Sequence, residues 1–236
     1  KTCLHLFALV IAAVYVNGEL CSSGNSSECR LTICLGIYWK ISCLDMVCTC
    51  MHTAGTSSTY VRWGKSACPG RDTELVYKGY VGGSHYQNPG GGVEFLCLPE
   101  DPTWGKNVGG TDSSATIYGA EYQLSIGSNP FTAVSTYDDV PCCVCRAPRT
   151  TNLMIPGRTN CYPGWNQEYT GYLMAGYNAH AGATSYVCVD ENPEAVIGGT
   201  AANYGRLMYV VQAHCGSLPC PPYAEGRVIA CVVCSL

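Results

Sequence analysis

The sequence is poor in charged residues. Of its 236 residues, 13% are Asp, Glu, Lys or Arg, and the formal net charge is -4. No run of five like charges occurs, so the chain lacks the basic stripe with which proteins hold a phosphate backbone. Nucleic acid is therefore not expected as a partner.

Motifs of the familiar enzyme classes are also missing. The sequence has no Gly-x-Ser-x-Gly elbow, phosphate loop or dinucleotide fingerprint, and its histidines lack metal-ligand spacing. We therefore expect neither a cofactor nor a metal site. An enzyme of unrecognised chemistry would have to use His85, His180 or the acidic pairs at 100–101, 138–139 and 190–191.

Long apolar segments are absent after the first eighteen residues. An apolar stretch from Leu4 to Val16 follows Lys1 and leads to Gly18. It is shorter than the roughly 20 residues of a membrane-spanning helix, which makes a permanent anchor the weaker interpretation. Residues 1–18 are instead predicted to be a signal peptide cleaved after Gly18, so we expect a secreted, extracellular protein without membrane association after cleavage.

Cysteine, by contrast, is abundant. The chain has 18 cysteines, which favours an oxidising compartment and a framework of disulfides. Residues 19–58 are predicted to form a small module closed by three local disulfides and followed by a linker. Its six cysteines are Cys21, Cys29, Cys34, Cys43, Cys48 and Cys50. A single sequon at Asn25 offers one N-glycosylation site.

The remaining chain repeats a pattern of four cysteines. Cys68, Cys97, Cys142 and Cys145 recur as Cys161, Cys188, Cys231 and Cys234, at offsets of 93, 91, 89 and 89 residues. Turn residues keep step with them, since a proline stands five positions after both Cys97 and Cys188. The pattern predicts an internal duplication, with one β repeat over 59–148 and a second over 149–236.

Short apolar runs bounded by turn residues predict strands rather than helices. The expected strands span 74–80, 93–98, 117–124 and 140–146 in the first repeat, and 168–175, 185–189, 206–213 and 228–233 in the second. The predicted fold class is mainly β: a disulfide-rich, duplicated antiparallel body of sandwich or barrel-like form, preceded by the small cysteine-rich module.

Strand geometry constrains the disulfides of the body. Cys142 and Cys145 are three residues apart, so in a strand their side chains leave opposite faces and need separate partners. Cys68 and Cys97 are expected to supply them, and Cys161 and Cys188 to serve Cys231 and Cys234 in the same way. Which cysteine joins which stays open. Cys215 and Cys220 are expected to close a small turn of their own.

Cys143 is left over by this arrangement. Its counterpart in the second repeat is Val232, so it has no repeat mate. Two alternatives follow: a buried free thiol, or a disulfide to a second chain in a homo-oligomer.

Several stretches resemble the secreted invertebrate proteins called short-chain collagen C4-like. They include Tyr60-Val-Arg-Trp-Gly64, Gly79-Tyr-Val-Gly-Gly-Ser-His-Tyr86, Tyr118-Gly-Ala-Glu-Tyr122, Cys161-Tyr-Pro-Gly-Trp165 and Cys215-Gly-Ser-Leu-Pro-Cys-Pro-Pro222. The resemblance implies an extracellular location and a noncollagenous body. Because the chain has no Gly-X-Y tract, it cannot form a collagen triple helix.

Aromatic residues beside glycine-rich loops are the candidate binding residues, because flat rings can stack on sugar faces. Ordinary packing in a β core is the competing interpretation, and it is favoured for most of the aromatic residues. The candidates are Trp63, His85, Tyr86, Trp165, Tyr177 and His180. A duplicated body would carry two related sites. The predicted function is a non-enzymatic extracellular role, with glycans or matrix proteins as partners; the alternative is a secreted enzyme of unrecognised chemistry.

Overall fold

The computed structural model describes the backbone of residues 39–44 and 47–52, and residues 56–70, 72–107, 109, 114–127 and 129–236. The chain divides into two compact units, Lys1–Ala54 and Gly55–Leu236. In the first unit β1 (Trp39–Leu44) pairs antiparallel with β2 (Val47–His52), which places Cys43 opposite Cys48 in the backbone register. The predictions for residues 1–18, Asn25, Cys21, Cys29 and Cys34 lie outside the described residues, as do the side chains of Cys43, Cys48 and Cys50.

The second unit is built from strands, and the described residues contain no helix. The prediction of a mainly β, disulfide-rich protein is confirmed. The strands are β3 (Ser58–Trp63), β4 (Glu74–Gly83), β5 (Leu96–Pro99), β6 (Tyr118–Gln123), β7 (Pro141–Ala147), β8 (Asn152–Pro156), β9 (Asn166–Ala175), β10 (Val187–Asp190), β11 (Arg206–Val210) and β12 (Ala230–Ser235). Over the described part of the chain, no helix suited to crossing a membrane is found.

All eight strands expected for the body are present, with bounds that differ by three residues or fewer. The strands β3 and β8 were not expected from the sequence. Both carry mixed polar and apolar side chains and pair on one side only over most of their length, so their local pattern is weak.

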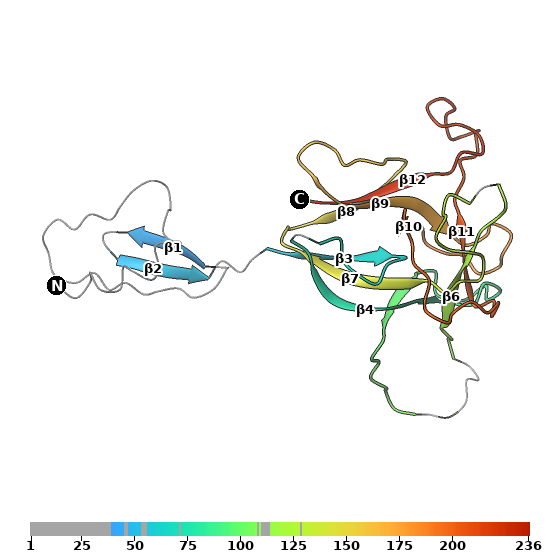
Figure 1. The fold of residues 1–236 in the computed structure, drawn as a ribbon, viewed down its shortest axis with the longest axis horizontal. Coiled ribbons are helices and arrows are strands. Elements are labelled where there is room, and N and C mark those ends of the chain that lie inside the picture. The colour runs from blue at the N-terminus through green and yellow to red at the C-terminus, as the bar shows by residue number, and fades with distance from the viewer. Residues whose placement is uncertain are drawn as a thin grey trace, which may run out of the picture. The chain divides into compact units, whose positions relative to one another are not determined.

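The strands of the body close into a ring. Hydrogen-bonded neighbours follow the order β3, β7, β4, β6, β11, β9 and β10, and β10 pairs with β3 again. In Figure 1, β3, β7 and β4 form one layer, and β8, β9 and β12 form the other. The sheet differs from the expected antiparallel one at two places, where β6 pairs parallel with β11 and β10 pairs parallel with β3. Both are junctions between the two halves of the body, whereas pairing within each half is antiparallel.

The two halves have matching hydrogen bonds as well as matching strands. β4 pairs with β7, β5 and β6, and β9 pairs with β12, β10 and β11. Val140 N donates to Ala120 O at 3.0 Å in the first half, and Ile229 N donates to Val211 O at 2.9 Å in the second. The strand pairing around β4 therefore resembles the pairing around β9.

One glycine in each half is required by the same close approach. A Cβ atom on Gly79 would lie 1.7 Å from the carbonyl oxygen of Leu98, and one on Gly171 would lie 1.8 Å from that of Val189. Leu98 and Val189 each follow the strand cysteine of β5 or β10. Any side chain at these glycines would push the short strand off the long one, which explains why glycine stands at both positions.

The disulfides have the same connectivity in both halves. Within each half the first cysteine joins the last, as Cys68–Cys145 and Cys161–Cys234, and the two inner cysteines join each other, as Cys97–Cys142 and Cys188–Cys231. A further bridge, Cys215–Cys220, closes the small turn before β12. The structure thus decides the pairing that strand geometry left open.

Cys143 lies in one of two apolar clusters of the core. It is unpaired, its side chain is 0% exposed, and it packs with Tyr60, Tyr169 and Leu173. A disulfide between Cys143 and a second chain would need a sulfur atom at the surface. The buried free thiol is therefore the alternative that the folded body fits.

Candidate functional site

The loops that follow β4 and β9 meet at the junction of the two halves. Since β6 and β11 pair side by side, and each also pairs with the end of its own long strand, both loops leave the sheet at the same place. Gly182 N donates to Tyr86 O at 2.8 Å, and Tyr86 N donates to Gly205 O at 3.1 Å. The backbone thus holds a loop of the first half against two segments of the second.

Six aromatic rings line this junction as one continuous set, which we call the aromatic surface. It consists of His85, Tyr86, Tyr118, Tyr177, His180 and Tyr209. Successive ring centroids lie 5.0 Å apart for Tyr118–His85, 4.6 Å for His85–Tyr86, 4.5 Å for Tyr86–His180, 5.3 Å for His180–Tyr177 and 5.3 Å for Tyr177–Tyr209. The loops that follow β4 and β9 thus contribute rings to one continuous surface.

The rings of the aromatic surface remain open to solvent. Tyr118 is 40% exposed and Tyr177 is 50% exposed, and the other four rings are half-buried. Rings in an ordinary core would be covered on both faces, whereas this arrangement presents flat apolar area together with phenol hydroxyl groups to solvent.

A buried arginine lies beneath the two loops. Arg206 is 0% exposed, and its Nη2 donates to Val93 O at 2.9 Å and to Ala183 O at 3.0 Å. Val93 belongs to the loop after β4 and Ala183 to the loop after β9, so one guanidinium ties both. Burial lowers the pKa of Arg206. Its role is to hold the loops that carry the rings.

Two further tyrosines flank the aromatic surface in an unusual backbone conformation. Tyr137 has φ 76° and Tyr204 has φ 55°, and among the described residues they are the non-glycine positions with positive φ. Their rings pack at 5.7 Å, and a hydrogen bond with Tyr137 raises the pKa of Tyr204. The buried carboxylate of Glu121 accepts a hydrogen bond from Asn203 N at 2.8 Å, which fixes the loop that carries Tyr204. Such strained conformations are found where a structure holds side chains for function.

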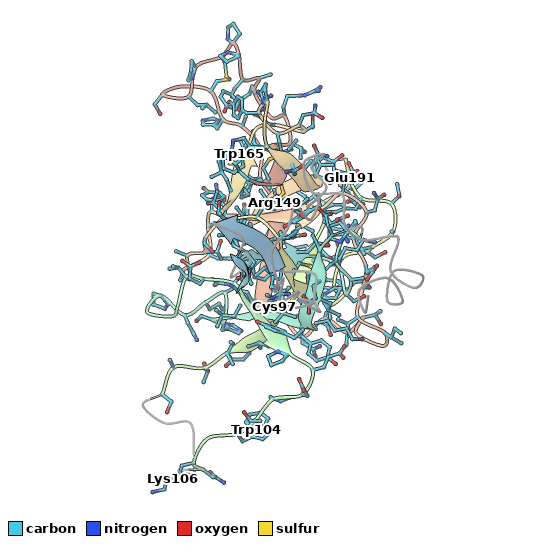
Figure 2. All side chains as sticks on the ribbon, turned by 90° about the vertical axis from the view of Figure 1, so that its left-hand side faces the viewer. Cys97, Trp104, Lys106, Arg149, Trp165 and Glu191 are labelled. Atoms are coloured by element: carbon cyan, nitrogen blue, oxygen red, sulfur yellow. A yellow bond between two sulfur atoms is a disulfide. The ribbon has the colours of Figure 1, made fainter. Side chains whose placement is uncertain are left out.

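Of the six candidate binding residues, the structure brings together His85, Tyr86, Tyr177 and His180. Trp63 instead packs against Phe95 beside the core, with ring centroids 6.5 Å apart. Trp165 stands in the turn before β9. Figure 2 shows it on a different part of the body from the extended loop that carries the exposed Trp104. Tyr118 and Tyr209 were not among the candidates expected from the sequence. Their equivalent places at the ends of β6 and β11 are the signal that could have identified them.

In each acidic pair considered for catalysis, one carboxylate has a structural partner. Asp190 accepts from Arg62 at 2.7 Å, and Glu100 lies 3.3 Å from Lys78. Asp138 accepts from Ser135 N at 2.8 Å. A hollow of about 500 Å³ is lined in part by Asp139, and another of about 300 Å³ by Trp63; neither is lined by the two histidines. In the described part of the chain, no hydrogen bond or ion pair joins these carboxylates to His85 or His180.

The titration of His180 provides a test of this geometry. Burial lowers the pKa of His180, and its Nδ1 has no hydrogen-bond partner. Since protonation is harder in the folded state, His180 favours folding above its ordinary pKa of 6.5, and this contribution is lost as the pH falls below that value. The nearest titratable neighbours are Tyr86, Tyr177 and Tyr209.

We expect the His180 imidazole to titrate below 6.5 when its ring protons are followed by NMR. The Tyr86→Ala variant, which uncovers one face of the ring, should return the value toward 6.5. An unchanged titration in that variant would show that Tyr86 does not shield His180.

The five disulfides of the body are compatible with an extracellular protein. No protein-family model matches the chain.

Proposed function

We propose that this protein binds carbohydrate polymers outside the cell through the aromatic surface, without catalysing a reaction. The observation that carries the proposal is the convergence of aromatic loops from both halves on one open surface. Exposed rings supply the apolar faces on which sugar rings stack, and tyrosine hydroxyl groups can bond to sugar hydroxyl groups. The disulfide framework and the resemblance to short-chain collagen C4-like proteins support an extracellular, matrix-associated role.

The low charge of the chain supports a neutral ligand. Charged residues make up 13% of the sequence, and none of the six rings of the aromatic surface carries a fixed charge. Recognition would therefore depend on stacking and hydrogen bonding rather than on ion pairs. A polymer is favoured over a single sugar because the rings continue from Tyr118 in the first half to Tyr209 in the second.

Replacing rings of the aromatic surface should weaken binding to neutral polysaccharides. We expect Tyr86→Ala or Tyr177→Ala to reduce affinity about tenfold each, which corresponds to about 1.4 kcal/mol for a central aromatic contact. Affinity would be measured by calorimetry with soluble oligosaccharides, after retention on immobilised cellulose, chitin and xylan identifies the ligand. Tyr86→Phe, which keeps the ring, should lose less than Tyr86→Ala.

Trp104→Ala is the matched control for this series. Trp104 is 88% exposed on a loop that extends away from the sheet, as Figure 2 shows. Its loss removes an exposed aromatic residue without touching the aromatic surface, so affinity should stay unchanged. Equal losses for Trp104→Ala and Tyr86→Ala, or no retention on any polysaccharide, would contradict the proposal.

A secreted enzyme is the second candidate, and one observation favours it. His85 and His180 both contact the ring of Tyr86, at 4.6 Å and 4.5 Å between centroids, so two possible proton carriers flank one hydroxyl-bearing ring. Shortening of a bound polysaccharide over time, abolished in His85→Gln or His180→Gln, would favour this candidate over simple binding.

A further inference from the structure

Three sulfur atoms lie together at β7, and none of them belongs to the loops that carry the aromatic surface. The Sγ atom of the free Cys143 is 3.7 Å from that of Cys145, which is bonded to Cys68. The Sγ atoms of all three residues lie within 4.8 Å of one another, and among the described residues no other group of three potential metal ligands is as compact. A thiol thus stands beside a disulfide, which is the arrangement that thiol–disulfide exchange requires.

We propose that Cys68, Cys143 and Cys145 form an internal thiol–disulfide exchange site, in which Cys68 alternates between Cys145 and Cys143. The thiolate of Cys143 attacks Sγ of Cys68. The Cys68–Cys143 bond forms, the Cys68–Cys145 bond breaks, and Cys145 leaves as a thiolate that takes up the proton lost by Cys143. The step needs no oxidant, because one disulfide and one thiol are present before and after it.

The fold explains why Cys68 would be the residue that changes partners. Cys143 and Cys145 are two residues apart on the same face of β7, which is paired on both sides by β3 and β4. Cys68 lies in the irregular segment between β3 and β4 and is partly exposed. A direct Cys143–Cys145 bond is disfavoured, since residues two apart in a strand have Cα atoms about 6.6 Å apart, near the limit for a disulfide.

The second half provides an internal control. Cys161–Cys234 has the same place in the fold as Cys68–Cys145, but Val232 stands where the first half has Cys143. Apart from Cys231 and Cys142, which are bonded to Cys188 and Cys97, β12 offers Cys161 one possible partner, whereas β7 offers Cys68 two. Any exchange that depends on the third sulfur must be confined to the first half.

The environment of Cys143 sets the pH dependence of the exchange. Burial raises the pKa of Cys143 to about 11, while Arg62 acts against the rise and Glu194 and Asp190 add to it. Tyr169 packs against the same cluster. The thiolate is thus scarce at neutral pH, and the exchange rate should increase about tenfold for each pH unit up to that pKa.

Disulfide mapping of the oxidised full chain would test the proposal. The folded protein is held at mildly alkaline pH, unfolded in acid, alkylated there with N-ethylmaleimide and digested with pepsin before mass spectrometry. We expect the alkylated cysteine to be partly Cys143 and partly Cys145, with Cys68 bridged to the other. Cys161 should be found bridged to Cys234 alone. Alkylation of Cys143 alone, at every pH and time, would overturn the proposal.

Two substitutions sharpen the result. Cys143→Val gives the first half the side chain of the second, and Cys68 should then be bridged to Cys145 only. Val232→Cys places a third sulfur in the second half, and Cys161 should then acquire two partners. If this variant does not fold, the distribution of alkylation between Cys143 and Cys145 in the wild-type chain still tests the proposal. The inference does not rest on carbohydrate binding, so either proposal can fail without the other.

Discussion

Removing the Cys188–Cys231 disulfide by substituting both cysteines with alanine should lower the free energy of unfolding by about 4 kcal/mol, because cross-linking a loop of this size restricts the unfolded chain. The bridge closes a sequence separation of 43 residues. Cys231 is 0% exposed and Cys188 is 1% exposed, so the loss of both sulfurs also leaves a cavity in the core. The measurement is guanidinium unfolding without reductant.

The double alanine variant at Cys215 and Cys220 is the matched control. That bridge spans 5 residues, and its Cys220 end is exposed. The loss expected from chain entropy alone is about 2 kcal/mol, with little added by packing. Equal losses in the two variants would show that neither loop length nor burial determines how much these bridges stabilise the body.

Replacing Glu168 with alanine should cost about 3 kcal/mol of stability, since a buried charge partner is removed from a bonded network. The Glu168 side chain is 2% exposed. It accepts from Arg149 at 2.7 Å, from Tyr60 at 2.9 Å and from Ser235. Burial and the bond to Glu168 raise the pKa of Tyr60. These residues come from β3, β9, β12 and the connection between the halves. Glu168→Ala should therefore weaken the contact between these four segments.

The control for Glu168 is Glu74, which pairs with Arg146 at the surface. Their side chains are 65% and 43% exposed, so Glu74→Ala should cost less than about 1 kcal/mol. Glu168→Gln, which keeps the size of the side chain, should fall between the two alanine variants. Chemical denaturation at neutral pH would measure all three. A loss for Glu168→Ala no larger than that for Glu74→Ala would refute the role assigned to the network.

Much of the body could be predicted from local patterns. Strands such as β4 and β9 are marked by apolar runs between turn residues, and alternation along a strand showed that Cys142 and Cys145 need separate partners. These features depend on neighbours in the sequence. By contrast, β3 and β8, which pair on one side only over most of their length, carry too weak a pattern to be recognised without their partners.

The aromatic surface could be predicted only in part, for a related reason. Glycine-rich loops marked His85, Tyr86, Tyr177 and His180 as candidates, but composition could not separate them from Trp63, whose ring packs beside the core. Whether a ring faces solvent or the core depends on the sheet around it, which local sequence does not specify.

Spacing and alternation along the chain were enough to predict the mainly β class and the cysteines that form disulfides in the body, because both patterns act over a few residues. The tertiary structure alone decided that β6 lies parallel to β11, which merges two loops into one surface. It also decided that Cys143 lies beside a disulfide. The physical reason is the same in both cases: these contacts join segments whose packing depends on the whole closed sheet.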